Sequence, residues 1–93
     1  MSELTPGLHG ASEEGVLGTW RGLEVGVWEC APGVDRDTEA DEVFVVLEGT
    51  ATIEFVKPAR PAIEIGPGDV VRLEEGMETV WTVHTHLRKV YLS

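Results

Sequence analysis

The sequence is poor in cysteine and in basic residues, and each shortage excludes a class of protein. Cys30 is its one cysteine, so no internal disulfide can staple the chain as in small secreted domains. Seven lysines and arginines stand against 17 aspartates and glutamates, which gives a formal net charge of −10. A surface this acidic repels phosphate backbones and anionic lipid headgroups. We therefore expect no nucleic-acid partner and no membrane partner.

The sequence also lacks long apolar runs and helical periodicity. No run approaches the roughly 18 apolar residues of a spanning helix, and residues 1–10 have neither the basic start nor the apolar stretch of a signal peptide. These observations favour a cytoplasmic protein. With 93 residues, the chain has room for one domain with one modest core.

Strand signals, by contrast, recur along the chain. Eight short runs are rich in valine, isoleucine, threonine or aromatic residues, and glycine, proline or acidic turns separate them. Such a series is typical of an all-β sandwich or barrel. We predict a flexible arm over residues 1–15 and one small antiparallel β-barrel over residues 16–93. The predicted strands are 16–20, 23–30, 43–47, 50–56, 63–65, 70–73, 79–83 and 87–92.

Two motifs give this barrel a family likeness. Glu42 is followed after six residues by Gly49, and the corner Pro67-Gly68-Asp69 precedes a strand and the turn at Gly76. In this order they resemble the two motifs of the cupin superfamily. More narrowly, Gly26-Val27-Trp28-Glu29, Trp81 and Arg88-Lys89-Val90-Tyr91 resemble the short single-barrel cupins grouped with the cupin domain of ureidoglycine aminohydrolase. The resemblance implies a double-stranded β-helix of the jelly-roll type and supports a homodimer, which would also cover sheet edges of so short a chain.

The metal ligands that the resemblance would imply are missing. Typical metal-binding cupins carry a His-x-His pair before the glutamate and a further histidine in the second motif. Residues 35–41 contain no histidine, and the matching residue of the second motif is Thr79. Glu42 alone cannot hold a transition metal, which needs three or four suitable ligands. We therefore expect no metal cofactor.

The acidic run over residues 35–42 holds five carboxylates, and we interpret most of it as a solvent-facing loop at the barrel mouth. The 1-3-5 spacing of Asp35, Asp37 and Glu39 resembles a calcium loop, but Ala40 replaces the required glycine and no helices flank it. Glu42 differs. Strand alternation places it on one face with Phe44, and the resemblance to cupins implies that this face points into the barrel. It is either a hydrogen-bonded remnant or a group that acts as an acid, a base or an amine contact.

Aromatic and polar side chains of the same inward parity complete the predicted site. Trp28 and Trp81 both fill and line the barrel. Lys89 and Tyr91 share the parity of Trp81 if the strand is regular, and an inward Lys89 could then pair with Glu42. A one-residue bulge would point both groups elsewhere, so the sequence leaves the direction of Lys89 open. The predicted ligand-binding residues are Trp28, Glu42, Thr79, Trp81, Lys89 and Tyr91, with Glu42 the candidate catalytic residue.

Two other features have mainly structural interpretations. His84 and His86 share one face of a strand, and parity places them on the surface. A metal held by this pair remains a minority alternative, since a third histidine, His9, lies in the arm. Cys30 has the parity of Trp28, and we interpret it as a small buried residue rather than a pocket thiol.

Three functions remain open from the sequence. The favoured one is metal-independent binding of a small polar or nitrogenous molecule in the barrel. The second is an enzyme resembling ureidoglycine aminohydrolase, with Glu42 acting on a small nitrogen-rich substrate. The third is a structural or regulatory dimer whose barrel is packed and takes no ligand.

Overall fold

A computed structural model describes residues 5–6 and 12–93, and within them the regular structure is entirely strand. The part of the chain described here has no helix that could cross a membrane. The strands are β1 (Thr5–Pro6), β2 (Ser12–Trp20), β3 (Leu23–Cys30), β4 (Gly33–Thr38), β5 (Glu42–Glu48), β6 (Ala51–Lys57), β7 (Arg60–Ile65), β8 (Val70–Leu73), β9 (Glu78–Val83) and β10 (Leu87–Leu92).

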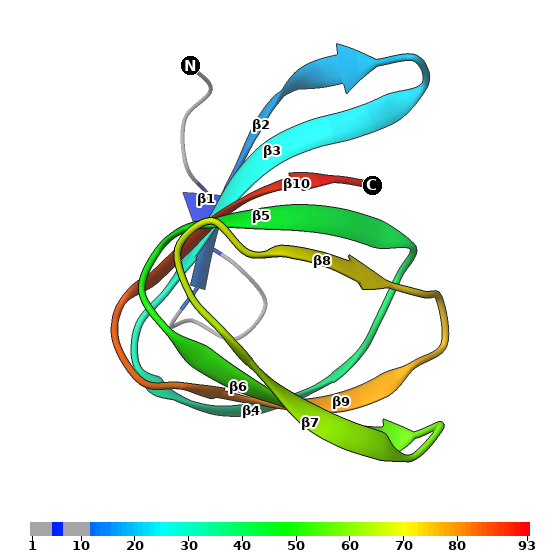
Figure 1. The fold of residues 1–93 in the computed structure, drawn as a ribbon. Helices are drawn as coiled ribbons and strands as arrows, with labels where there is room; N and C mark the ends of the chain where they lie inside the picture. The colour runs from blue at the N-terminus through cyan, green and yellow to red at the C-terminus, as the bar shows by residue number, and fades with distance from the viewer. Residues whose placement is uncertain (1–4, 7–11) are drawn as a thin grey trace.

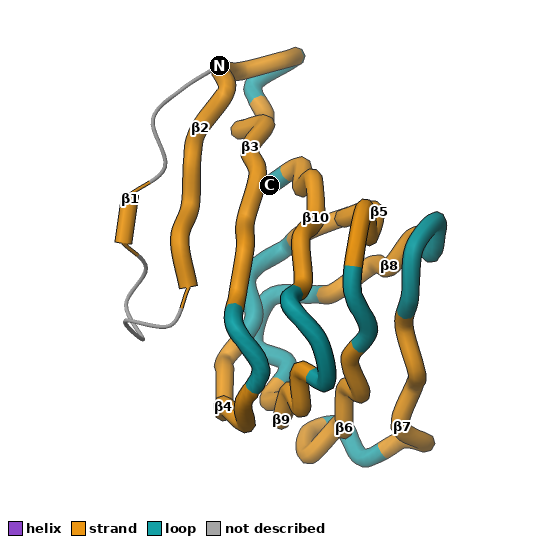
Figure 2. The backbone as a smooth tube through the Cα atoms, turned by 90° about the vertical axis from the view of Figure 1, so that its left-hand side faces the viewer, coloured by secondary structure: helices purple, strands orange, loops and turns teal. Residues whose placement is uncertain are grey.

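The strands form two antiparallel sheets that face each other. One has six strands in the order β1-β2-β3-β10-β5-β8, and the other has four in the order β4-β9-β6-β7. Figure 1 shows the β5–β8 pair above the β6–β7 pair, with β4 and β9 completing the lower layer. The tip of the β2–β3 hairpin extends beyond the barrel (Figure 2). The predicted all-β, antiparallel fold is confirmed.

One strand contradicts the sequence interpretation. Residues 33–38, expected to begin a solvated loop, form β4 and pair with β9, with Asp35 opposite Trp81 and Asp37 opposite Thr79. β4 reverses the usual pattern, because Val34 is 70% exposed while Asp35 is half-buried. Aspartate has a low β-propensity, so the sequence of residues 33–38 does not indicate a strand.

The start of β2 also differs from the prediction. It begins at Ser12, inside the segment expected to be a flexible arm. Residues 1–4 and 7–11 of that arm, with His9 among them, lie outside the described residues.

The apolar core lies between the two sheets and takes side chains from β5, β6, β7, β8, β9 and β10. It follows the period-two alternation of the strands, since Phe44 and Val46 of β5 are buried while Val45 between them is half-buried. Fully burying such a side chain contributes about 1.5–3 kcal/mol. The largest fully buried side chains are Phe44, Ile53, Leu73, Leu87, Val46 and Thr79.

The turn after β5 depends on Gly49. Its φ is +89°, a left-handed conformation that favours glycine. A Cβ at this position would lie 2.1 Å from the carbonyl oxygen of His86, which is backbone and cannot swing away. The close approach of the 84–86 segment is a second reason why no side chain fits.

Candidate functional site

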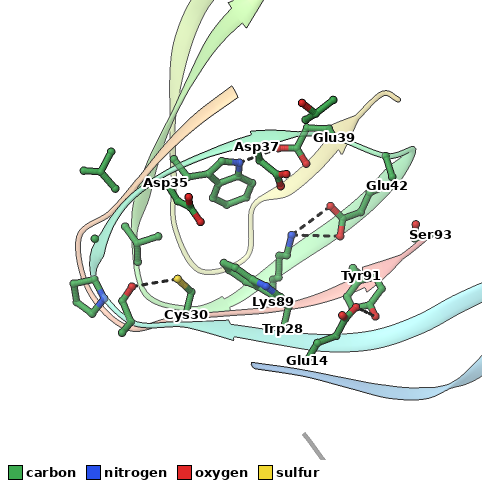
Figure 3. Close-up of a pocket in the computed structure, with 18 of the residues that line it drawn as sticks. Glu14, Trp28, Cys30, Asp35, Asp37, Glu39, Glu42, Lys89, Tyr91 and Ser93 are labelled. Carbon is green, nitrogen blue, oxygen red and sulfur yellow. Dashed lines mark hydrogen bonds and ion pairs between the residues drawn. The ribbon is translucent and has the colours of Figure 1, made fainter. Parts of the chain in front are cut away.

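A cavity of about 630 Å³ borders the apolar core, and Trp81, Val83 and Tyr91 belong both to the core and to the cavity lining. Its walls come mainly from β3 and β10 in one sheet and from β4 and β9 in the other (Figure 3). Among the described residues that line it, one carries a basic group, Lys89. The acidic residues lining it are Glu14, Glu24, Asp35, Asp37, Glu39 and Glu42.

Lys89 and Glu42 form an ion pair in the cavity. The Lys89 ammonium Nζ lies 3.3 Å from both carboxylate oxygens of Glu42, and the two side chains point toward each other in Figure 3. Lys89 is only 6% exposed. Burial raises the pKa of Glu42, and the nearby Lys89 opposes that effect. Both side chains point into the cavity, and this answers the question of the direction of Lys89 that the sequence left open.

Three aromatic rings surround the same ammonium. Lys89 Nζ lies 4.3 Å from the ring centre of Phe44, 4.9 Å from that of Trp28 and 5.0 Å from that of Trp81. These distances are within the range in which a ring face attracts a cation. The position results from the alternation of β10, where Leu87, Lys89 and Tyr91 are buried in turn. It persists although the register with β5 shifts between Arg88 and Lys89.

Glu39 is the residue of the site that the sequence interpretation missed. Expected in a solvated loop, it is 7% exposed and lines the cavity. Its oxygen Oε2 accepts hydrogen bonds from Thr79 Oγ1 at 2.6 Å and from Trp81 Nε1 at 3.0 Å. Buried hydroxyl and indole donors need acceptors. An inward Thr79 and an inward Trp81 therefore indicate a buried acceptor, but the residues near them in the sequence do not identify it as Glu39.

Thr79 therefore has a different position from the one predicted. It is 2% exposed, bonds to Glu39 and is not among the residues that line the cavity. Trp28 and Trp81 do line it, with ring centres 6.0 Å apart and an angle of 58° between the rings. The two indoles thus form a tilted aromatic corner.

Tyr91 marks a second polar cluster in the cavity. Its hydroxyl lies within hydrogen-bonding distance of Glu14 Oε1 and of Glu24 Oε2, the latter at 2.8 Å. Burial, followed by the bonds to these two carboxylates, raises the pKa of Tyr91. The sequence interpretation found Tyr91 but neither glutamate, because both lie in the β2–β3 hairpin, more than 60 residues away in the chain.

Cys30 and the two histidines differ in how they relate to the cavity. Cys30 is half-buried, lines the cavity and donates to the Ala31 carbonyl at 3.2 Å. Burial, together with Asp35, raises the pKa of its thiol, so it is not poised as a thiolate. His84 and His86 are exposed, contacting Thr52 at 2.7 Å and Glu29 at 3.1 Å. They do not converge on a common point.

The donor set does not fit the transition metal that many cupins hold. Glu42 is engaged by Lys89, and the position of the second-motif histidine holds Thr79, whose hydroxyl donates to Glu39. Over residues 5–6 and 12–93, no group of three histidine, cysteine or acidic residues is arranged to hold a metal ion.

Comparison with known proteins places this barrel in a family. Residues 13–91 match the EutQ-like cupin domain family, and the chain belongs to it. It is a small single-domain cupin. These matches do not extend to the narrower resemblance to ureidoglycine aminohydrolase domains. No curated protein matches the chain.

Solved structures agree with the fold. A protein of unknown function from Acidithiobacillus ferrooxidans is 22% identical, with a TM-score of 0.83 over 98% of this chain and 86% of that one. A protein of unknown function from Vibrio parahaemolyticus is 16% identical, with a TM-score of 0.80 over 99% and 97%. The Clostridium difficile EutQ protein is 20% identical, with a TM-score of 0.72 over 87% and 60%. At these identities the likeness establishes the fold alone.

Proposed function

We propose that the chain binds a small molecule in the barrel cavity without the help of a transition metal. The observation that carries the proposal is the cavity itself, at about 630 Å³. Ligand pockets typically have volumes of roughly 300–1,000 Å³ and combine apolar walls with a few oriented polar groups. Here the walls include Trp28 and Trp81, and the oriented groups include Glu39 and the Lys89–Glu42 pair.

A fragment panel and a metal analysis test this proposal. The purified protein is screened by NMR against small amines, ureides, alcohols, sugars and carboxylates, and its metal content is measured by mass spectrometry. We expect at least one class to bind, and binding to be lost in Cys30→Phe, which fills part of the cavity. Equal binding by the filled variant, or no binding by any compound, would favour the packed structural barrel. A stoichiometric transition metal would contradict metal independence.

An enzyme is the second candidate, and one observation favours it. Glu42 faces the cavity, and burial raises its pKa toward the range of a general acid or base. The contact of both its oxygens with Lys89 opposes this role, because the carboxylate is already engaged. Release of ammonia from ureides, present in the wild type and abolished in Glu42→Gln, would support an enzyme. Absence of turnover with bound ureide would leave a binding protein.

We also propose that two copies associate through the β2–β3 hairpin. Its exposed large apolar side chains are Val16, Leu17, Trp20 and Leu23. A second copy offers the same surface, so a two-fold contact pairs apolar groups with apolar groups. By light scattering, we expect a dimer that Leu17→Glu converts to a monomer. Val70→Glu, at an exposed valine of β8, is the matched control. A monomeric wild type would contradict this interface.

A further inference from the structure

We propose that the cavity selects small organic cations, amines or guanidiniums with an apolar body, and that Glu39 is the residue that recognises their charge. The inference rests on the proposed function, because it concerns the ligand class of the same cavity. The cavity volume alone implies that a small molecule fits. The charge of the lining adds the sign of the ligand's charge, and Glu39 adds the residue that determines specificity.

The lining of the cavity is predominantly acidic. Six acidic side chains and one basic side chain face this volume among the residues that the structure describes. The opposite side of the interior is apolar, and charges beside such low-dielectric walls act more strongly than in water. The resulting potential attracts cations and repels carboxylates and phosphates. A neutral ligand gains little from it.

The cavity already stabilises one ammonium, that of Lys89. This group is held by the carboxylate of Glu42 at 3.3 Å and by three aromatic rings at 4.3 to 5.0 Å. The combination of ring faces with a carboxylate is the usual means of recognising alkylammonium groups. Lys89 thus shows which chemistry the cavity accommodates.

Two hydrogen bonds fix the orientation of the Glu39 carboxylate. The hydrogen bonds from Thr79 and Trp81 both go to Oε2, and neither goes to Oε1. The carboxylate is therefore held in place by neighbouring side chains before any ligand arrives, which lowers the entropy cost of binding. A charged N–H donor makes a stronger hydrogen bond to such a carboxylate than a hydroxyl does.

Trp81 links the charged group to the apolar wall. Its indole N–H donates to Glu39, and its ring forms the tilted corner with Trp28. A ligand with an apolar body against this corner would place its charged nitrogen near Glu39. This geometry favours arylalkylamines and similar molecules over charged molecules that have no apolar body.

Three probes of nearly equal shape test the sign of charge. Phenethylamine, 2-phenylethanol and phenylacetate share one ring and differ in carrying a positive, no or a negative charge at neutral pH. By titration followed in protein NMR spectra, we expect the amine to bind at least about tenfold more tightly than the alcohol, and phenylacetate not to bind. Equal affinities for amine and alcohol, or tighter binding of phenylacetate, would overturn the inference.

The role of Glu39 is tested by Glu39→Gln, which keeps an oxygen to accept from Thr79 and Trp81 but loses the charge. We expect the affinity for phenethylamine to fall about tenfold while that for 2-phenylethanol is unchanged. Glu54→Gln, at an exposed carboxylate of β6 outside the cavity lining, is the matched control and should change neither. An unchanged amine affinity in Glu39→Gln would refute the assignment to this residue.

Ionic strength gives a test that needs no variant. Raising NaCl from about 0.05 M to about 0.5 M screens charges and should weaken amine binding but not alcohol binding. An affinity for the amine that does not change with salt would contradict charge selection. This test stays valid even if Glu39→Gln does not fold. The two proposals fail differently: if none of the panel binds, the binding function fails, whereas charge-blind binding defeats only this inference.

Discussion

The two sides of the barrel interior are built from shared strands but differ in almost every chemical respect. The β6–β7–β8 side is filled with apolar residues such as Ile53 and Leu73, each 0% exposed. The β3–β4 side keeps a cavity of about 630 Å³ lined with carboxylates. Strand β10 serves both, with Leu87 in the core and Lys89 in the cavity. One side of this small barrel is filled with apolar side chains, while the other encloses the cavity in which we propose that a ligand binds.

The largest expected effect is on the turn that supports the packed side. Gly49→Ala must accommodate a Cβ 2.1 Å from the carbonyl oxygen of His86, next to Leu87. Gly76→Ala is the control, because Gly76 has a similar φ of +87° but no atom within 4 Å. We expect Gly76→Ala to cost about 1–2 kcal/mol and Gly49→Ala at least about 2 kcal/mol more, measured by urea unfolding. Equal costs would show that the backbone relaxes.

The next effect compares truncations on the two sides. Leu73→Ala removes a fully buried side chain from the packed side and should cost about 2–5 kcal/mol. Cys30→Ala removes a half-buried group that already borders empty space, so we expect it to cost less than about 1 kcal/mol. Urea unfolding midpoints of both variants test this. Similar losses would mean that the cavity side is as tightly packed as the core.

A third prediction concerns the ion pair. Lys89→Met leaves the carboxylate of Glu42 without its ammonium and should cost about 3 kcal/mol at pH 7. Burial raises the pKa of Glu42, so the folded variant retains that proton above the ordinary value of 4.5 while the unfolded chain loses it. The variant should therefore lose stability as the pH rises from about 4.5 toward 7.

The control for this prediction is the double variant Lys89→Met/Glu42→Gln. It has no carboxyl at position 42, so the difference between the two variants should grow as the pH rises. Unfolding at pH 4.5 and pH 7 measures that difference. If the double variant shows the same pH dependence as Lys89→Met, the group that titrates is not Glu42.

The smallest effect is expected at the second polar cluster. Tyr91→Phe removes the hydroxyl that contacts Glu14 and Glu24, at a cost of about 1 kcal/mol near neutral pH. Because the pKa of Tyr91 is raised, the folded wild type keeps a proton that the unfolded chain loses above about pH 10. The wild type should lose stability there, and the difference from Tyr91→Phe should shrink. A difference that grows above pH 10 would contradict the assigned shift.

The same contrast explains what could be predicted from the sequence. Period-two alternation groups Glu42 with Phe44 on β5 and, if the strand is regular, Lys89 with Tyr91 on β10, so the Glu42–Lys89 pair was one open possibility. Alternation of apolar and polar residues cannot predict β4, where Asp35 is half-buried and Val34 is exposed. Nor can it pair Glu39 with Thr79, 40 residues away, because such contacts depend on how the two sheets face each other. The buried face of β5 was therefore predictable from alternation, whereas β4 and the position of Glu39 were not.

The placement of Lys89 and Glu39 has a consequence for exchange kinetics. Lys89 lies on β10, which is hydrogen-bonded to neighbours on both edges, β3 and β5. Glu39 follows β4, which among the described residues pairs along one edge only, with β9. Amide protons exchange fastest where the fewest bonds must open. The two walls of the cavity should therefore open at different rates. The lifetime of a molecule bound there, as we propose, should follow the faster-opening wall, at β4.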